Sequence, residues 1–485
     1  MNDDCATYLG AKGYTIYKES LTVQEQELIR RELTVRPFAP KSSIAKPQAF
    51  PVYRESKKKF YVPRFYGMNT YGIPDEERIS SGKDIDLKFK GELRDFQKPI
   101  VDTYVKSAQK NECGLLEIHT GAGKTVMGLN IISKLKKKTI IIVHKDFLLR
   151  QWIERIEQFL PDAKVGRIQG KILDIEDKDI VIGMLQSIAM KEYPPEVFAD
   201  FGLTIVDECH HISAEVFSRS LFKTVTKYML GLSATMNRKD GLTKVIKMFL
   251  GEVVYKKERK GENNVLVRAI QYTNDDEDYS KIEYNFKGQV HYTKMIKKLC
   301  EFNRRSEFIL KVLKDLLKDK INEQIMILGH NKNLLKYLFD AIKHRDIASV
   351  GYYIGGMKEK DLKLSESKKI IIATYAMAEE GLDIKTLTTL LMATPRVDVT
   401  QAVGRILRRK HTQANVIDIV DQHPIFERHW NKRRIFYTKQ KYNILITDID
   451  GYKNNKWEQI MKRNKKKPVI NPDDIFFKGQ CLISN

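Results

Sequence analysis

Short apolar runs alternate with longer amphipathic stretches over most of residues 114–395. The runs are rich in Ile, Leu and Val, which is typical of buried strands. Two of the intervening stretches, residues 124–135 and 148–160, space their apolar side chains at helical intervals. Strands that alternate with helices predict a parallel sheet with helices on both faces. The first strands that we expect are residues 115–118, 139–143, 180–185, 203–206 and 228–234.

The alternation begins again after a charged segment, residues 256–277, which we take as the junction between two units. Another helix is then expected at 305–317, followed by strands at 324–328, 368–374, 388–393 and 415–420. The predicted fold class is therefore α/β, with two parallel-sheet units in tandem. The expected division is an α+β accessory region at 1–85, α/β domains at 86–255 and 256–445, and a basic extension at 446–485.

The first 85 residues contain prolines and lack the strand–helix alternation. Thr22 and Glu25 have the spacing of a capping box that opens a helix. Residues 51–67 interleave aromatic and basic side chains. A β-hairpin that turns near Ser56 is the favoured interpretation of this pattern, with inward aromatic and solvated lysine side chains. A surface that stacks on bases and binds phosphates is the alternative.

The charge of the chain favours a polyanionic partner. The 485 residues include 85 Lys+Arg and 62 Asp+Glu, which gives a net charge of +23. Nucleic acid is the commonest partner of such a surplus. A lysine-rich genome that only adds solvated surface charge would give the same composition, so composition alone leaves both interpretations open.

Cysteine use and hydropathy exclude other classes. The cysteines lie far apart without a CxxC pair, which argues against a disulfide framework or a zinc site and suits a reducing compartment. The N-terminus lacks the apolar segment of a signal peptide, and the longest apolar runs are too short to span a bilayer. We expect a soluble, intracellular protein without membrane contact.

The segment HTGAGKT, residues 119–125, predicts a phosphate-binding loop between a strand and a helix. Gly121 and Gly123 allow the backbone N–H groups to turn towards phosphate, and the helix N-terminus adds partial positive charge. The leading glycine of the usual pattern is replaced by Ile118, which we assign to the strand. The predicted nucleotide-binding residues are Thr120, Gly121, Ala122, Gly123, Lys124 and Thr125, with Lys124 on the β/γ-phosphates and Thr125 on Mg²⁺.

The segment LTIVDECHH supplies the acidic partner of this loop. A strand at 203–206 would deliver Asp207 and Glu208 at its carboxyl end. Asp207 there can hold Mg²⁺, and Glu208 can orient or deprotonate the attacking water. His210 and His211 are neighbours whose side chains diverge, and no third ligand is evident, which argues against zinc.

The second α/β unit adds arginines to the set. In QAVGRILRR, residues 401–409, Arg405 and Arg408 fall on one face if the segment is helical. An arginine that reaches the γ-phosphate from another unit accelerates hydrolysis by about 10³–10⁵-fold. The alternative is a basic helix that meets solvent, which the accompanying Gln401 and Gly404 make less attractive.

The order of these motifs resembles that of the superfamily 2 helicases, which have two RecA-like domains that close on ATP. The similar segments are LRDFQ (93–97, adenine contact), HTGAGKT (119–125, motif I), HKDFLLRQW (144–152, motif Ia), Gln186–Ser187, DECH (207–210, motif II), SAT (233–235, motif III), ATYAMAEEGLDI (373–384, motif V) and 401–408 (motif VI).

The resemblance implies a role for each matching residue, with ATP and Mg²⁺ as cofactors. Catalysis would involve Lys124, Asp207, Glu208, Gln401, Arg405 and Arg408. ATP binding would add Arg94, Gln97, Gly381 and Asp383 to the phosphate loop, and Thr125 and Asp207 would bind the metal. Ser233, Ala234 and Thr235 would couple hydrolysis to movement. Nucleic-acid contacts would come from His144, Lys145, Gln186, Ser187, Arg238 and Thr374.

Within the superfamily, the chain looks most like XPB-type DNA helicases and their relatives in large DNA viruses, such as the poxvirus transcript-release helicase. The segments that carry this likeness are 93–97, 148–152 and 231–242. XPB-type proteins have Arg-Glu-Asp where this chain has Arg238, Lys239 and Asp240, which puts that motif's role in opening duplex in doubt. The resemblance implies DNA as partner, contact with a transcription machinery and, for a viral protein, the host cytoplasm or the virion.

Three other functions remain open. An RNA helicase of the DEAD-box type would normally show PTRELxxQ and HRxGRxxR, and neither motif is present. RNA nevertheless stays an alternative partner. A nucleic-acid-binding regulator with weak ATPase activity is disfavoured by the complete set of catalytic residues, and an NTPase that acts on no nucleic acid is disfavoured by the net charge.

Overall fold

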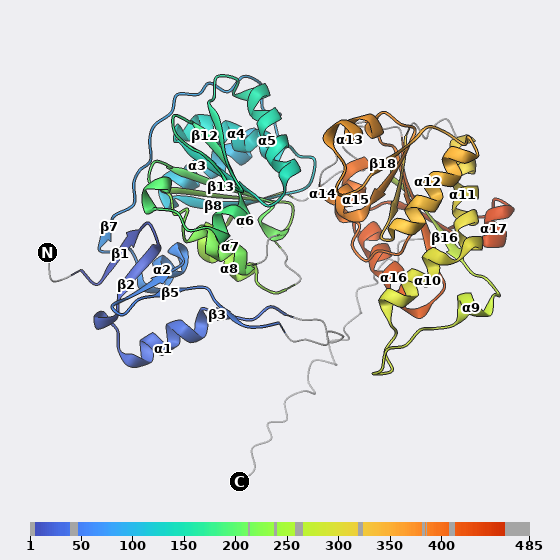
Figure 1. Ribbon diagram of the computed structural model, residues 1–485, viewed down its shortest axis with the longest axis horizontal. Coiled ribbons are helices and arrows are strands. Elements are labelled where there is room, and N and C mark those ends of the chain that lie inside the picture. The colour runs from blue at the N-terminus through green and yellow to red at the C-terminus, as the bar shows by residue number, and fades with distance from the viewer. Residues whose placement is uncertain are drawn as a thin grey trace, which may run out of the picture. The chain divides into compact units, whose positions relative to one another are not determined.

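The computed structural model describes residues 5–38, 47–211, 214–236, 240–257, 265–318, 324–380, 384, 386–406 and 413–460. The chain forms two compact units, Met1–Gly261 and Glu262–Asn485, which are shown in Figure 1. No helix in the described ranges is both long enough and apolar enough to cross a membrane.

The first unit is built on an eight-stranded sheet with the order β11-β10-β12-β9-β13-β14-β8-β15. All neighbours are parallel except β11, which pairs antiparallel with β10. The strands are β8 (Cys113–Ile118), β9 (Thr139–Val143), β10 (Val165–Gln169), β11 (Ile172–Asp174), β12 (Ile180–Met184), β13 (Leu203–Asp207), β14 (Tyr228–Ser233) and β15 (Val253–Lys257).

Helices cover both faces of this sheet (Figure 1). Strand β9 contacts a core on each face, with Ile140 and Ile142 in one core and Ile141 and Val143 in the other. This explains why its sequence is almost entirely apolar. The helices α3 (Lys98–Asn111), α4 (Lys124–Leu135) and α5 (Asp146–Phe159) contribute to one core, and α6 (Leu185–Met190), α7 (Ala214–Leu221) and α8 (Thr243–Leu250) to the other. The parallel, doubly covered sheet predicted for this part of the chain is confirmed.

The N-terminal region of the first unit is a smaller α+β structure with a five-stranded sheet, order β5-β6-β2-β1-β7. Thr22 and Glu25 form the predicted capping box at the start of its first helix. The elements are β1 (Thr7–Gly10), β2 (Gly13–Tyr17), α1 (Val23–Glu32), β3 (Thr34–Val35), β4 (Phe50–Pro51), β5 (Arg54–Glu55), β6 (Lys59–Val62), α2 (Arg64–Tyr71) and β7 (Glu76–Glu77).

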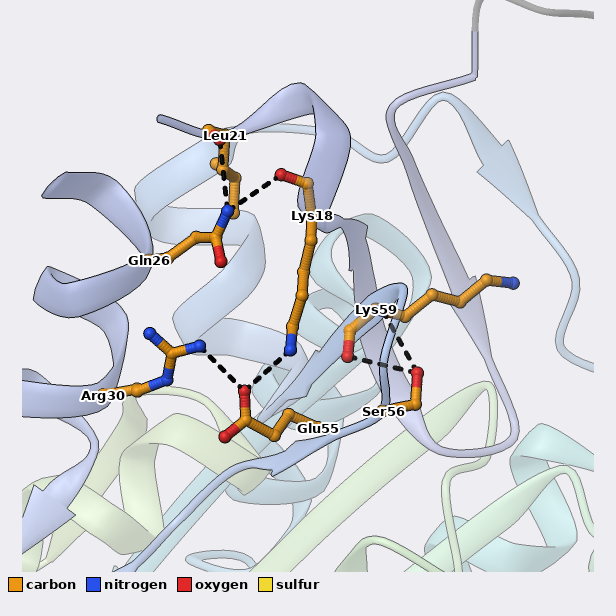
Figure 2. A network of polar contacts seen from close by, with 7 residues as sticks. All are labelled: Lys18, Leu21, Gln26, Arg30, Glu55, Ser56 and Lys59. Carbon is orange, nitrogen blue, oxygen red and sulfur yellow. Dashed lines mark hydrogen bonds and ion pairs between the residues drawn. The ribbon is translucent and has the colours of Figure 1, made fainter. Parts of the chain in front are cut away.

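The aromatic and basic segment forms the predicted hairpin. Strands β5 and β6 pair antiparallel, and the Ser56 N–H donates to the Lys59 carbonyl at 2.8 Å. Phe60 is fully buried on the inner face. Figure 2 shows the contacts of the hairpin with α1 and the segment before it. The Glu55 carboxylate accepts from Arg30 of α1 (3.1 Å) and from Lys18, which precedes the helix (2.9 Å). The alternative role of this segment in nucleic-acid contact stays a prediction.

The second unit repeats the plan with an eight-stranded sheet, order β18-β19-β17-β20-β21-β16-β22-β23. Only β23 is antiparallel to its neighbour. The strands are β16 (Val265–Tyr272), β17 (Ile325–Gly329), β18 (Val350–Tyr353), β19 (Ile370–Thr374), β20 (Thr389–Met392), β21 (Ala414–Asp421), β22 (Asn443–Asp448) and β23 (Glu458–Gln459). The expected start of the C-terminal extension at residue 446 falls inside β22, so the sheet includes part of that segment.

Two cores again lie on opposite faces of the sheet. The described helices of this unit are α9 (Glu277–Ser280), α10 (Tyr292–Glu301), α11 (Asn303–Lys318), α12 (Lys332–His344), α13 (Glu359–Glu366), α14 (Tyr375–Glu380), α15 (Thr400–Ile406), α16 (Pro424–Lys439) and α17 (Ile449–Lys453). Helices α10, α11 and α12 contribute to one core, whereas α14 and α15 contribute to the other.

Two buried ion pairs fasten helices to strand β21. Arg305 of α11 binds Asp421 through Nε (2.6 Å) and Nη2 (2.8 Å), and its Nη1 donates to the Ala393 carbonyl at 2.8 Å. Arg433 of α16 binds Asp418 in the same two-bond manner, at 2.7 and 2.8 Å. All four side chains are at most 1% exposed. Each carboxylate therefore depends on its arginine for compensation of its charge.

Replacing Arg305 with Met would leave Asp421 buried without its counter-charge. We expect Arg305→Met to lower the free energy of unfolding by about 3–5 kcal/mol. The matched control is Arg345→Met, which breaks the exposed pair with Glu307 and should cost less than about 1 kcal/mol. Urea unfolding followed by circular dichroism measures both variants. Equal losses in the two variants would contradict the structural role given to the buried pair.

Candidate functional site

The loop between β8 and α4 has the backbone that its glycines predict. Gly121 and Gly123 both have a φ of 84°, in the region that favours glycine over other residues. Ile118 is the last residue of β8 and is fully buried, as expected from its place in the strand. Helix α4 begins at Lys124, so its free N–H groups and positive dipole end lie where a phosphate would bind.

Gln97 connects the segment before α3 to this loop. Its side chain is 3% exposed, accepts from the Arg94 N–H at 2.9 Å and donates to the Ala122 carbonyl at 2.7 Å. A Cβ atom at position 123 would lie 2.5 Å from Gln97 Nε2, so the glycine is also required for this contact. The structure thus brings Gln97 to the phosphate loop, with the backbone of Arg94 bonded to its side chain. Their contact with adenine stays a prediction.

Asp207 is the last residue of β13, Glu208 follows it, and both meet the loop there. Lys124 Nζ lies 2.9 Å from Glu208 Oε1. The Asp207 carboxylate is 4% exposed and accepts from the Glu208 N–H at 3.0 Å. Glu208 itself has a φ of 47°, which is uncommon for a residue with a side chain and is found at functional sites. The structure therefore brings together the three residues that the sequence nominated for phosphate, metal and water.

Burial makes the charge of Asp207 costly. It raises the pKa of this carboxyl group to about 6, with a further contribution from the negative charge of Glu208. The positive charge of Lys124 and the hydrogen bond from Trp152 act in the opposite direction. Burial also raises the pKa of the neighbouring Cys209 thiol to about 12, so this residue stays protonated at neutral pH. A bound cation would favour the charged form of Asp207.

The oxygen donors fit Mg²⁺. Thr125 follows Lys124 in the first turn of α4 and offers a hydroxyl, and Asp207 offers a carboxylate. Mg²⁺ prefers such ligands and usually completes its shell with water and substrate phosphates. Within the described ranges, no group of three or more His, Cys, Asp or Glu side chains could hold a metal ion by itself.

A chain of polar contacts leads from Glu208 to the predicted coupling segment. His210 Nδ1 lies 3.4 Å from Glu208 Oε2 and 2.6 Å from Ser233 Oγ. The Ser233 hydroxyl also lies 2.6 Å from the Thr235 carbonyl, to which it donates. Because Ser233 ends β14, these contacts connect the acidic motif to the segment after this strand, where Ala234 and Thr235 lie.

Four of the residues predicted to contact nucleic acid share one edge of the first sheet. His144 and Lys145 follow β9, and Gln186 and Ser187 follow β12, which is its parallel neighbour. The Ser187 hydroxyl accepts from the Gly170 N–H at 2.9 Å. Since β13 lies on the other side of β9, these segments and the acidic motif emerge at the same carboxyl edge.

In the second unit, Thr374 ends β19 and Gln401 lies on α15. Arg405 also lies on α15, but its side chain is outside the described part of the chain. Gly381, Asp383, Arg408 and Arg238 lie outside the described residues as well. Their predicted roles stay predictions.

Sequence reasoning gave no role to Trp152, although it lies within the segment that resembles motif Ia. Its indole N–H donates to Asp207 Oδ2 at 2.9 Å, and the ring is fully buried. The two residues are 55 positions apart, and no spacing rule links a helix residue to the end of a strand at that separation. The tryptophan itself was the available signal, because a buried indole N–H needs an acceptor.

The raised pKa of Asp207 predicts the effect of Asp207→Asn on the protein without metal. Between the ordinary value of 3.8 and about 6, the folded state holds this proton more tightly than the unfolded state, so stability falls as pH rises. A rise of this size corresponds to roughly 3 kcal/mol. We expect Asp207→Asn to be more stable than the wild type at pH 8, but by less than that amount, because the amide can accept only one of the two hydrogen bonds that the carboxylate accepts from Trp152 and Glu208.

The gain should shrink as the pH falls from 6 towards 4. Urea unfolding in the presence of EDTA measures it, with the exposed Asp102→Asn as the control that should gain nothing, since its carboxylate pairs with Lys134. Lower stability of Asp207→Asn at pH 8 would contradict the prediction.

Comparison with known proteins identifies the family of the chain. Residues 90–238 match the family described as type III restriction enzyme, res subunit. The protein L396 of Acanthamoeba polyphaga mimivirus is named an ATP-dependent RNA helicase and is 35% identical over 458 residues, 92% of this chain and 87% of that protein. African swine fever virus QP509L (strain Badajoz 1971), which bears the same type of name, is 28% identical over 356 residues, 68% of this chain and 69% of that protein.

The fold has a counterpart among solved structures. A fragment described as an HsdR subunit of a type I restriction enzyme from Vibrio vulnificus superposes with a TM-score of 0.51 at 16% identity, over 77% of this chain and 71% of that one. The predicted α/β fold with tandem RecA-like units is confirmed. The identity to L396 over nearly the whole chain decides the family. The chain belongs to the superfamily 2 helicases of large DNA viruses, a group of nucleic-acid-dependent ATPases.

Proposed function

We propose that this helicase acts on DNA and couples the hydrolysis of Mg²⁺–ATP to movement along the duplex or to its opening. The observation that carries the ATPase part is the meeting of Lys124, Asp207 and Glu208 at the carboxyl edge of the first sheet. The choice of DNA is supported by the resemblance of segments 93–97, 148–152 and 231–242 to XPB-type proteins. A role in viral transcription rests on the same resemblance.

The ion pair of Lys124 with Glu208 gives ATP binding a consequence for catalysis. The β/γ-phosphates would compete with Glu208 for the Lys124 ammonium group. Glu208 would then lose a positive partner, which makes its carboxylate a stronger base towards the attacking water. Mg²⁺, held by Thr125 and Asp207, would neutralise charge on the phosphates. Substrate binding would in this way prepare the base that the reaction needs.

Residues of the second unit would add positive charge and strand contacts. We assign Arg405 and Arg408 to stabilisation of the γ-phosphate charge, together with Gln401, and Gly381 and Asp383 to ATP binding. Sequence-independent movement requires contacts to the nucleic-acid backbone. The segments that would supply such contacts include His144, Lys145, Gln186, Ser187, Arg238 and Thr374. The polar chain from Glu208 through His210 to Ser233 would couple hydrolysis to these segments.

A second function is favoured by one observation. The relatives L396 and QP509L are named RNA helicases, so RNA is the alternative substrate. The chain lacks the PTRELxxQ and HRxGRxxR motifs of DEAD-box proteins, which speaks for DNA.

Two substitutions test the ATP site. Lys124→Ala should weaken ATP binding and reduce turnover at saturating nucleic acid by at least about 100-fold. Glu208→Gln should retain ATP binding and lose turnover to a similar extent, because only the base is removed. Phosphate release measures turnover, and a fluorescent ATP analogue measures binding.

The matched control is Lys134→Ala, on the same helix α4, which removes an exposed lysine that pairs with Asp102. It should keep wild-type turnover. If Lys124→Ala or Glu208→Gln hydrolyses ATP like the wild type, the assigned site is wrong.

The substrate is tested by stimulation of ATP hydrolysis with DNA and RNA of matched sequence and length at one salt concentration. We expect duplex or single-stranded DNA to raise turnover at least about 10-fold more than RNA, because the motif pattern is that of the XPB type. Stimulation by RNA and not by DNA would reject the DNA proposal in favour of an RNA helicase. Fixed salt is essential, since affinity for either polyanion depends steeply on ionic strength.

A further inference from the structure

Trp152 is the side chain that fixes the orientation of Asp207. Its Nε1–H donates to Asp207 Oδ2 at 2.9 Å, while Asp207 Oδ1 accepts from the Glu208 N–H at 3.0 Å. Each carboxylate oxygen thus has one protein donor, and the plane of the group is set from two different elements. A carboxylate has about four acceptor positions, so both oxygens keep capacity for a cation.

The indole ring is also held in place from the phosphate-loop helix. A Cβ atom built at Gly128 of α4 would lie 3.0 Å from Trp152 Cη2 and 3.5 Å from Leu232 Cδ1 of β14. Because Gly128 has no side chain, the Trp152 ring can pack closely against α4. Trp152 contacts α4 directly and is bonded to the end of β13, so one fully buried ring touches the elements that carry the phosphate-binding and metal-binding residues.

The helix that bears Trp152 starts at the segment proposed to contact nucleic acid. Lys145 is the N-cap residue of α5, and Asp146 is its first residue. Asp146 accepts from Gln169 at 2.8 Å and pairs with Arg150 on the next turn, so this end of the helix is anchored by side chains. A shift of the helix start on strand binding would be carried along α5 to the indole.

We propose that Trp152 is a positioning residue through which α5 controls the metal-binding carboxylate of Asp207 and makes it respond to bound nucleic acid. The proposal rests on the proposed function, since it takes Asp207 as the Mg²⁺ ligand and the start of α5 as a strand contact. Trp152 acts through Asp207 and touches neither ATP nor nucleic acid. Loss of the indole N–H would free one carboxylate oxygen and allow the group to rotate.

The first test is metal binding, measured without turnover. Trp152→Phe keeps an aromatic ring and removes the donor. We expect the affinity for Mn²⁺·ADP, followed by electron paramagnetic resonance with Mn²⁺ in place of Mg²⁺, to fall about 10-fold, as for other residues that orient a metal ligand. The affinity for ADP in EDTA should not change. The control is Ile156→Val, one turn further along α5, which trims a buried side chain.

A second variant guards against loss of folding. Gly128→Ala leaves Trp152 in place and presses a methyl group against its ring, so it should also weaken Mn²⁺·ADP binding while the circular dichroism spectrum stays that of the wild type. Wild-type Mn²⁺·ADP affinity in either folded variant would overturn the proposal.

The second test is the response to nucleic acid. The ratio of stimulated to basal ATP turnover should fall at least about 3-fold in Trp152→Phe, measured at saturating Mg²⁺, and stay unchanged in Ile156→Val. An unchanged ratio in Trp152→Phe would overturn the control of Asp207 by α5. Failure of the proposed function would look different from this result. In that case nucleic acid would not stimulate the wild type, or Glu208→Gln would keep wild-type turnover.

Discussion

Asp207 has to keep a negative charge at a place where burial opposes it. Burial raises its pKa, and the structure lowers the cost with the ammonium group of Lys124 and two N–H donors. These partners come from α4, from α5 and from the residue after β13, so the three elements must meet at one point. A parallel sheet provides that point, because its strands end at the same edge and the following helices start there.

The central strands that build this edge can be predicted from the sequence. Strands nearer the rims of the sheets are harder to predict. Strands β9 and β13 are buried on both faces and therefore form continuous apolar runs. Strand β10 was not predicted because the exposed Arg167 interrupts its apolar pattern, and β22 was not predicted because it begins and ends with exposed polar residues. Partial exposure accounts for these two differences. Strand β16 is different, because it is buried along most of its length but lies inside the charged segment 256–277 that we took as the junction between the units.

The same distinction applies to the site. Gly121, Gly123 and Lys124 are predictable since the chemistry of a phosphate loop is contained in a few adjacent residues. The contact between Trp152 and Asp207 is not, because it depends on the sheet placing β13 next to β9 and on the course of the helix that follows β9. Residues that act within one motif can be found by spacing, whereas residues that connect motifs require the structure.

The edges of the two sheets bear on solubility. A strand at the rim of a parallel sheet presents unpaired N–H and C=O groups that invite pairing with another chain. Here one rim of each sheet ends in a very short antiparallel strand, β11 of three residues and β23 of two. The opposite rim of the first sheet is β15, which carries Lys256 and Lys257. Short strands and edge lysines both disfavour the pairing of these three rims with a strand of another chain.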